Sequence, residues 1–343
     1  MSLHHSGNAI RDALSRPLKD LRISLTDRCN FRCKYCMPKE VFGKDYSYLS
    51  EEETLTIDEI VRVTRILSEA GVHKVRLTGG EPLLRRDLPE IIHALASLPG
   101  IDDIAVTSNG SMLTPKRAKA LKDAGLRRIT ISLDALDDTV FRRMNDVGFP
   151  VNRVLTAIES ALAAGLTPVK VNMVVRRGFN DTEILPMAEH FRGTGVVLRF
   201  IEYMDVGNSN GWKLDDVVSA SEIYDTIAQK YPLVPVAPDL PGEVAERFAY
   251  QDGAGQIGII HAVTKPFCTG CSRLRLTASG ELFTCLFATR GKPIRAMLRD
   301  GATDEELRAA MTGVWKARTD RYSEERNEQT VHRPRIEMSR IGG

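Results

Sequence analysis

The sequence predicts an α/β protein whose main part is an incomplete (β/α)6 barrel of the TIM type. Short runs rich in β-branched residues alternate with segments of helical periodicity along the first two thirds of the chain. Repeated units of strand, helix and strand require right-handed parallel crossovers. Six such units, without a clear seventh or eighth, indicate a barrel that does not close. A doubly wound open sheet is the alternative.

The strands are expected at positions where apolar and β-branched residues cluster between turn signals. Between them, apolar residues recur at spacings of three and four, which predicts amphipathic helices, as at 57–67 and 151–162. The six expected strands are 21–26, 74–78, 103–107, 128–133, 168–175 and 196–203.

The alternation ends after residue 203, and a different pattern follows the proline-rich stretch 231–242. This second region is predicted to form hairpins, and helices follow over 303–322. We therefore expect an N-terminal extension over 1–20, a barrel over 21–230 and a C-terminal region over 231–343. The two hairpins pair 247–250 with 256–263 and 273–277 with 281–286.

Composition and charge restrict the class of protein. A hydrophobic fraction of 43% and a charged fraction of 27% are ordinary for a globular protein, and a net charge of +2 disfavours binding to a nucleic acid polymer. No stretch approaches the roughly 20 apolar residues that span a membrane, and 1–20 is too polar for a signal peptide. We expect a cytoplasmic protein without a membrane partner, and we assign no role to His4 and His5.

The six cysteines form two groups of three, with none elsewhere in the chain. In a reducing compartment such clustering favours metal binding over disulfides. The first group, Cys29, Cys33 and Cys36, follows the first strand with the spacing C-x-x-x-C-x-x-C. Three thiolates can bind three irons of a [4Fe-4S] cluster and leave the fourth iron open to an external ligand. A zinc site lacking one ligand is the alternative, although zinc sites normally close with four.

The second group, Cys268, Cys271 and Cys285, again offers three thiolates and no fourth. His261 can complete a zinc site of the Cys₃His type. Because the first group favours iron, we prefer a second [4Fe-4S] cluster in the C-terminal region, whose open iron can bind substrate directly.

Four cations occupy mid-strand positions where parallel strands are normally apolar. An unpaired buried cation costs several kcal/mol, so four of them in one barrel imply an anionic ligand such as a polyphosphate or a carboxylate. Pairing with Glu202, Asp134 or Glu81 is the alternative, but those carboxylates are too few for all four. The cations are Arg22, Arg76, Lys170 and Arg199, and Arg273 and Arg275 alternate at period two beside the second cysteine group.

The segment Cys29-Asn30-Phe31-Arg32-Cys33-Lys34-Tyr35-Cys36 resembles the signature of the radical S-adenosylmethionine superfamily. Thr78-Gly79-Gly80-Glu81-Pro82 resembles the superfamily's segment for the methionine amino group, where glycines permit close backbone approach. The resemblance implies that S-adenosylmethionine binds at the open iron. It further implies cofactor contacts at Tyr35, Gly80, Ser132 and Met204.

The whole chain resembles the GTP 3′,8-cyclases of molybdenum cofactor biosynthesis, which are lyases. The resemblance rests on both cysteine groups, on Cys271-Ser272-Arg273-Leu274-Arg275 and on the terminal Gly342-Gly343. It implies a 5′-deoxyadenosyl radical that abstracts the ribose 3′ hydrogen of GTP, after which the substrate radical closes onto guanine carbon 8. The residues implied to bind GTP are Arg22, Arg76, Thr107, Lys170, Arg273 and Arg275.

The same resemblance gives the glycine pair a catalytic role. A tail that ends in Gly342 and Gly343 has no Cβ to obstruct its entry into a narrow cavity. A disordered tail is the alternative. Further implied partners are an electron donor of flavodoxin or ferredoxin type and a downstream cyclic pyranopterin monophosphate synthase, and a homodimer is left open.

Two other functions remain open from the sequence. One is a different two-cluster radical enzyme that acts on an anionic or peptide substrate. The other is a zinc-binding scaffold without catalysis.

Overall fold

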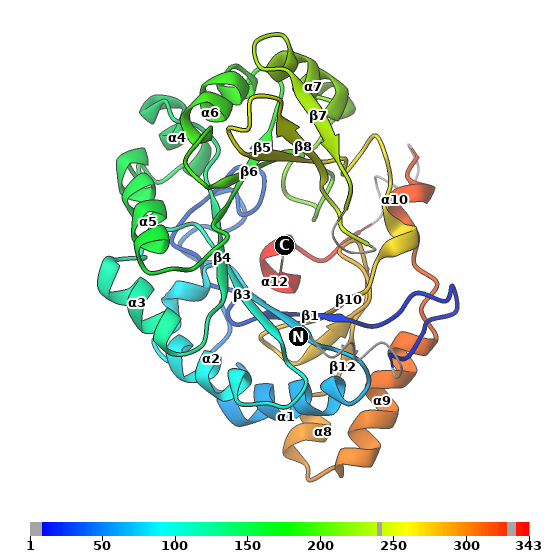
Figure 1. Ribbon diagram of the computed structural model, residues 1–343. Helices are drawn as coiled ribbons and strands as arrows, with labels where there is room; N and C mark the ends of the chain where they lie inside the picture. The colour runs from blue at the N-terminus through cyan, green and yellow to red at the C-terminus, as the bar shows by residue number, and fades with distance from the viewer. Residues whose placement is uncertain (1–8, 239–241, 328–333, 343) are drawn as a thin grey trace.

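The computed structural model describes residues 9–238, 242–327 and 334–342. These residues form a 12-stranded sheet that curls around a central space, with helices on its outer face (Figure 1). The strand order is β12-β11-β10-β1-β2-β3-β4-β5-β6-β9-β8-β7. The strands from β10 to β9 in this order run parallel: β10 (Arg273–Leu276), β1 (Asp20–Ser24), β2 (Lys74–Thr78), β3 (Asp103–Ser108), β4 (Arg128–Ser132), β5 (Lys170–Val175), β6 (Val197–Glu202) and β9 (Gln256–Ile260).

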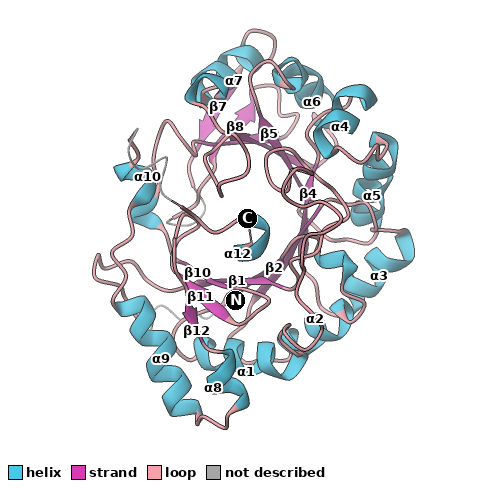
Figure 2. Cartoon of the chain, turned by 180° about the vertical axis from the view of Figure 1, so that it is seen from behind, coloured by secondary structure: helices cyan, strands magenta, loops and turns pink. Residues whose placement is uncertain are grey.

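The helices surround the barrel, as the view from behind also shows (Figure 2). Helices on the outer face, with a hollow inside, confirm the incomplete βα barrel rather than the doubly wound sheet. The helices of the barrel are α1 (Ile57–Ser68), α2 (Leu88–Ala96), α3 (Pro115–Asp123), α4 (Asp138–Asn145), α5 (Val151–Ala163), α6 (Ile184–Phe191) and α7 (Ala220–Ala228). Those of the C-terminal part are α8 (Arg295–Arg299), α9 (Asp304–Lys316), α10 (Tyr322–Glu325) and α12 (Met338–Ile341).

The C-terminal strands extend the barrel sheet at both of its edges. Both expected hairpins form, as β8 (Glu246–Tyr250) with β9 and as β10 with β11 (Glu281–Phe283). However, β9 also pairs in parallel with β6, and β10 pairs in parallel with β1. The parallel part of the sheet therefore exceeds the six predicted strands. The antiparallel edges end in β7 (Leu233–Val236) and β12 (Lys292–Pro293).

The core lies between the sheet and the helices. On β1 and β2, alternate residues such as Leu21, Ile23, Val75 and Leu77 are fully buried against the helical layer. The intervening residues face the inside of the barrel, because successive side chains of a strand point to opposite faces. This alternation directs the mid-strand cations inward.

The last described helix, α12, lies inside the barrel (Figures 1 and 2). Its Ile341 is completely buried, so the last described turn of the chain is packed into the barrel. None of the helices within the described residues is long and apolar enough to cross a membrane.

Candidate active site

The barrel encloses a cavity of about 1210 Å³. Every residue that the sequence proposes for a cluster, for S-adenosylmethionine or for GTP lines this cavity. The glycine pair is the exception: Gly342 lies beside the cavity-lining Thr78, and Gly343 is outside the described residues. The lining residues in question are Cys29, Cys33, Cys36, Cys268, Cys271, Cys285, Tyr35, Gly80, Ser132, Met204, Arg22, Arg76, Thr107, Lys170, Arg273 and Arg275.

The two cysteine groups lie at opposite ends of the parallel strands. Cys29, Cys33 and Cys36 follow the carboxyl end of β1, where active sites of βα barrels are built. Cys271 precedes the amino end of β10, and Cys285 follows β11, which runs back toward that same end. The cavity therefore has one cysteine group at each of its two ends.

The loop of the first group is held by its own backbone and by one arginine. Arg32 donates to the carbonyl oxygens of Cys29 and Phe42, each at 2.8 Å. Phe31 packs against Phe149, with ring centroids 5.2 Å apart. The backbone N–H of Phe31 also reaches the sulfur of Cys29 at 3.4 Å. These contacts fix the positions of the thiols relative to the barrel.

Gly79 and Gly80 have a steric role within the fold that the sequence did not indicate. The sequence suggested that they let the backbone approach a ligand, and in the structure a Cβ on either would also collide with the backbone of 26–28. The N–H of Gly80 donates to Thr26 O at 2.7 Å. The glycines therefore let the segment before Cys29 pack against the end of β2, which positions the first cysteine group.

Glu81 also serves the protein itself. Its carboxylate accepts hydrogen bonds from Leu83 N (2.9 Å), Ser108 Oγ (2.8 Å) and Asn109 N (2.7 Å). Burial raises its pKa to about 7. Asn109 Nδ2 lies 3.8 Å from Cys29 Sγ, so this network connects the end of β3 to the first cysteine group.

Cys271 differs from the first group in its electrostatic surroundings. Burial raises the pKa of Cys29 to about 12, with Glu81 adding to the effect, and burial also raises the pKa values of Cys33 and Cys36. Burial works against ionisation of Cys271 too, but nearby Arg273 and Arg318 outweigh it and lower the pKa of that thiol to about 6. Metal ligation requires thiolates. Cys271 therefore ionises readily, whereas burial raises the pKa of Cys285 in the same group to about 11.

Both cysteine groups offer the thiol donors that iron–sulfur clusters use. All six cysteines are free, partly buried thiols that line the cavity. Backbone N–H groups approach two of the sulfurs, Phe31 N to Cys29 and Phe287 N to Cys285 at 3.5 Å, and such hydrogen bonds tune iron–sulfur clusters. The Nε2 atom of His261, the candidate fourth zinc ligand, lies 2.8 Å from Glu246 Oε2.

The mid-strand cations form a row across the inner wall. The strand register places Arg22 beside Arg76 on β2 and beside Arg275 on β10. Burial and mutual repulsion lower the pKa of Arg76 to about 10, of Arg199 to about 9 and of Lys170 to about 7. Each of these cations therefore loses its proton more readily than a solvated side chain does.

Pairing within the protein does not neutralise this row. Among the described residues, Arg22, Arg76, Lys170 and Arg199 form no ion pair with a carboxylate. Arg76 donates to Thr107 Oγ1 at 3.1 Å, and Arg199 donates to Asn172 Oδ1 at 2.9 Å. The three carboxylates that were candidates for pairing accept hydrogen bonds elsewhere: Glu81 as above, Asp134 from Tyr35 and Val174, and Glu202 from Ala220, Val263 and Thr264. The row therefore has no bonded carboxylate among the described residues, and carboxylates such as Asp20 and Glu243 act on it only at longer range.

The tail contacts Arg275, which lies beside Arg22 of this row. Arg275 Nη1 donates to the carbonyl oxygens of Ile341, at 3.3 Å, and of Gly342. Gly342 has a φ of +71°, and a Cβ there would collide with Thr78 Oγ1. A glycine is therefore required at this position for steric reasons, and Arg275 contacts the tail while it lines the cavity.

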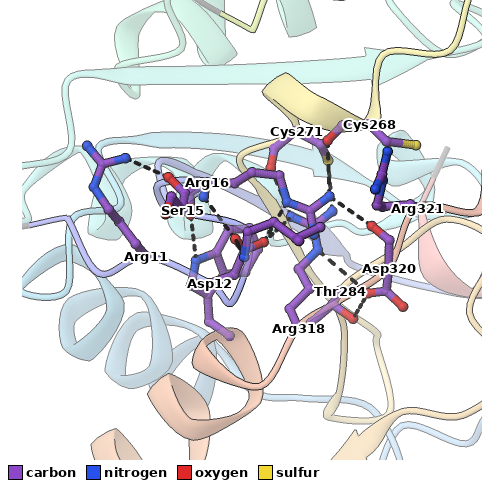
Figure 3. Close-up of polar contacts among 12 residues, drawn as sticks. Arg11, Asp12, Ser15, Arg16, Cys268, Cys271, Thr284, Arg318, Asp320 and Arg321 are labelled. Atoms are coloured by element: carbon purple, nitrogen blue, oxygen red, sulfur yellow. Dashed lines mark hydrogen bonds and ion pairs between the residues drawn. The ribbon is translucent and has the colours of Figure 1, made fainter. Parts of the chain in front are cut away.

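Sequence reasoning missed the charged residues behind the second cysteine group. Asp12, Arg16 and Arg318 are buried and contact one another beside Cys268 and Cys271 (Figure 3). They come from the N-terminal segment and from the residues after α9. No motif marks them, because charged residues at these spacings are typical of exposed segments.

Comparisons with known proteins agree with this geometry. The model of the Radical SAM superfamily matches residues 23–191, and the model "Molybdenum Cofactor Synthesis C" matches residues 196–324. A protein named GTP 3′,8-cyclase from Acidothermus cellulolyticus is 52% identical over 92% of this chain and 88% of its own length. One of the same name from Staphylococcus saprophyticus is 48% identical over 97% of this chain and 99% of its own length.

A solved structure supports the fold. Streptococcus suis SuiB, crystallised with the precursor peptide SuiA, superposes with a TM-score of 0.61 at 14% identity, over 90% of this chain and 65% of that one. At this identity the likeness concerns the fold alone.

The barrel, together with a three-cysteine loop at the carboxyl end of its first strand, defines a radical S-adenosylmethionine enzyme, a class that uses a [4Fe-4S] cluster and S-adenosylmethionine. Within that class, the chain belongs to the GTP 3′,8-cyclase family of molybdenum cofactor biosynthesis.

Proposed function

We propose that this protein is a GTP 3′,8-cyclase, a lyase that joins carbon 3′ of the GTP ribose to carbon 8 of its guanine and so yields 3′,8-cyclo-7,8-dihydro-GTP. One observation carries the proposal. A single cavity has a cysteine group at each end and a row of cations between them that has no carboxylate partner among the described residues. A nucleoside triphosphate satisfies this arrangement, because its phosphates can lie among the cations while its base and ribose reach the two cysteine groups.

The row supplies the binding of the triphosphate. Arg22, Arg76, Lys170 and Arg199 carry positive charge in a cavity withdrawn from bulk water, where charge-assisted hydrogen bonds to phosphate are strongest. Thr107 holds Arg76 in place through its hydroxyl. With the triphosphate among these cations, the guanine extends toward the second cysteine group, and the ribose faces the first.

The carboxyl ends of the strands supply the cofactor site. Tyr35, Gly80, Ser132 and Met204 lie on the cluster loop or at the ends of β2, β4 and β6, around the first cysteine group. Cys29, Cys33 and Cys36 would hold one [4Fe-4S] cluster, and Cys268, Cys271 and Cys285 a second. When bound, the first cluster and S-adenosylmethionine supply the radical that removes the 3′ hydrogen, with an external flavodoxin- or ferredoxin-type protein as electron donor.

The chain itself contributes orientation and exclusion of water. The tail packs inside the barrel, with Ile341 fully buried and Gly342 bonded to Arg275. We assign Gly342 and Gly343 to positioning of the nucleotide for ring closure, where a small displacement costs about 100-fold in rate.

A nucleotide panel tests the proposal. The reconstituted protein is incubated anaerobically with S-adenosylmethionine, a reductant and each ribonucleoside triphosphate in turn, and the products are resolved by mass spectrometry. The proposal predicts 5′-deoxyadenosine together with an isomer of GTP, and only with GTP. Equal consumption of all the nucleotides, or of none, would refute it.

A further inference from the structure

The N-terminal segment before β1 is part of the wall behind the second cysteine group. Asp12 Oδ2 lies 2.6 Å from Arg16 Nε and 3.6 Å from Arg318 Nη1. All three side chains are almost completely buried. Asp12, in the segment before β1, thereby contacts Arg318, which lies just after α9 and about 300 residues further along the chain (Figure 3).

Both guanidinium groups reach the cysteine group itself. Arg16 Nη1 donates to Cys268 O at 3.0 Å. Arg318 donates twice to one residue, through Nη1 to Cys271 O at 2.8 Å and through Nη2 to Cys271 Sγ at 3.1 Å. Figure 3 shows Arg318 aimed at Cys271 with Asp12 beside it. The fork of a guanidinium matches such a two-point contact, whereas an ammonium cannot reproduce it.

The guanidinium of Arg318 is fixed on its remaining sides. It lies over the ring of Trp315, with 4.7 Å between its central carbon and the ring centroid. Trp315 is itself fully buried. With a ring on one face, a carboxylate at 3.6 Å and a backbone carbonyl at 2.8 Å, Arg318 has little freedom except to hold the sulfur of Cys271.

The buried charges beside the second cysteine group sum to a positive excess. Arg16 and Arg318 face one fully buried carboxylate, Asp12, while Asp320 is partly exposed and lies 3.6 Å from Arg318 Nε. Within the described residues, Arg318 Nε and Arg16 Nη2 are buried and have no hydrogen-bond acceptor. A buried excess of positive charge is costly unless an anion compensates it. Three thiolates bound to a cluster are such an anion.

We propose that Arg318 is a positioning residue for the second iron–sulfur site, held by Asp12, and that its hydrogen bond to Cys271 Sγ stabilises the reduced form of that cluster. A donor on a ligand sulfur favours the more negatively charged, reduced state and so raises the reduction potential. The inference rests on the proposed function, because it presumes a cluster on Cys268, Cys271 and Cys285. It goes further in making the segment before β1 a part of that site.

The test is a redox titration of the holoenzyme with S-adenosylmethionine present, followed by electron paramagnetic resonance. S-Adenosylmethionine perturbs the signal of the first cluster and so distinguishes the two. In Arg318→Met, the equilibrium constant for reduction of the second cluster should fall at least about tenfold, or about 59 mV for one electron. In Arg318→Lys, which keeps the charge but not the fork, the fall should be intermediate. The first cluster should be unchanged in both.

Arg321→Gln is the matched control. Arg321 lies three residues away, is half exposed and pairs with Glu324, and it acts on Cys268 only through its charge, so its loss removes a nearby charge and no hydrogen bond to sulfur. The potential of the second cluster in this variant should fall by less than in Arg318→Lys, and that of the first cluster should be unchanged. An Arg318→Lys potential equal to that of the unaltered chain overturns the inference, even if Arg318→Met does not fold. A shift of both clusters together, or an equal shift in Arg321→Gln, overturns it as well.

Failure of the proposed function would look different. The unaltered chain would then bind about four irons and show one midpoint potential in place of two. In that case no second cluster exists for Arg318 to influence.

Discussion

The carboxylate of Glu337 lies so close to the α-carbon of Gly207 that a Cβ at that position would collide with it. The same carboxylate accepts from Asn208 N at 3.1 Å and from Ser209 Oγ at 3.0 Å. The loop after β6, which also carries Met204, therefore binds Glu337 just before α12 and fixes where the tail enters the barrel.

Gly207→Ala should break the contact between this loop and the Glu337 carboxylate. The substitution introduces a Cβ at a φ of +72° and also displaces the Glu337 carboxylate. We expect less cyclised nucleotide per 5′-deoxyadenosine, because cofactor cleavage continues while the tail is misplaced. Both products are measured by mass spectrometry. Gly211→Ala is the control: its φ of +61° gives a similar backbone penalty, but nothing lies within 4 Å of the new Cβ. An equal loss of cyclised nucleotide in the two variants would contradict a specific contact between this loop and the tail.

Deletion of Gly342 and Gly343 should block ring closure while sparing binding. The tail contacts Arg275 and Thr78 but contributes no cysteine and none of the row's mid-strand cations. Iron content, GTP affinity and thermal unfolding should stay near those of the unaltered chain, while the cyclised product falls about 100-fold. Gly342→Ala should act similarly, since its Cβ collides with Thr78 Oγ1. Full cyclisation by the deletion variant would return the tail to a passive role.

Each cysteine group should carry about four irons, so that replacing one group by Ala halves the iron content. Loss of Cys29, Cys33 and Cys36 should abolish 5′-deoxyadenosine formation. Loss of Cys268, Cys271 and Cys285 should spare uncoupled cofactor cleavage but remove nucleotide turnover. Iron assays and 5′-deoxyadenosine quantification separate these results. Cofactor cleavage by the first variant would make our assignment of the two groups wrong.

GTP binding should weaken as pH rises above 7. Burial and the neighbouring cations lower the pKa of Lys170 to about 7, so the free protein holds this ammonium only below that pH. Above it, binding of the triphosphate must be accompanied by uptake of a proton, which lowers the apparent affinity by up to about tenfold per pH unit. Calorimetry in buffers of different ionisation enthalpy measures the proton uptake.

Two variants check the role of Lys170. Lys170→Ala should lose about 1.5–3 kcal/mol of GTP binding energy, the range of a charged hydrogen bond, and should lose this pH dependence. Lys170→Arg keeps a charge at higher pH, so its affinity should fall less between pH 7 and 9. Binding of S-adenosylmethionine should be unaffected. A pH profile shared by Lys170→Ala and the unaltered chain would exclude Lys170 as its source.

Local patterns predicted much of the barrel. Strand β2 begins and ends where its pattern predicts, and β5 starts two residues later than expected, at Lys170. The inward direction of Arg22 and Arg76 also followed from period-two alternation. Strand β7 was missed because it contains Pro235, which is tolerated there only because β7 is an edge strand.

The long-range contacts were not predictable from local patterns. The parallel pairing of β10 with β1 joins segments at opposite ends of the chain, and hairpin signals report only antiparallel neighbours. For the same reason, nothing in the sequence placed Arg318 against Cys271 or Glu337 against Gly207. Gly79 and Gly80 were noticed, but what packs against them, the backbone of 26–28, required the structure.

The central claim is that one cavity places the GTP ribose next to the cofactor bound at the first cysteine group. GTP deuterated at carbon 3′ tests this claim most directly, in an anaerobic reaction with S-adenosylmethionine and a reductant. Our account predicts that 5′-deoxyadenosine recovered from the reaction carries the deuterium, in proportion to the cyclised nucleotide formed. Unlabelled 5′-deoxyadenosine alongside cyclised product would contradict it, because the hydrogen would then have come from another position.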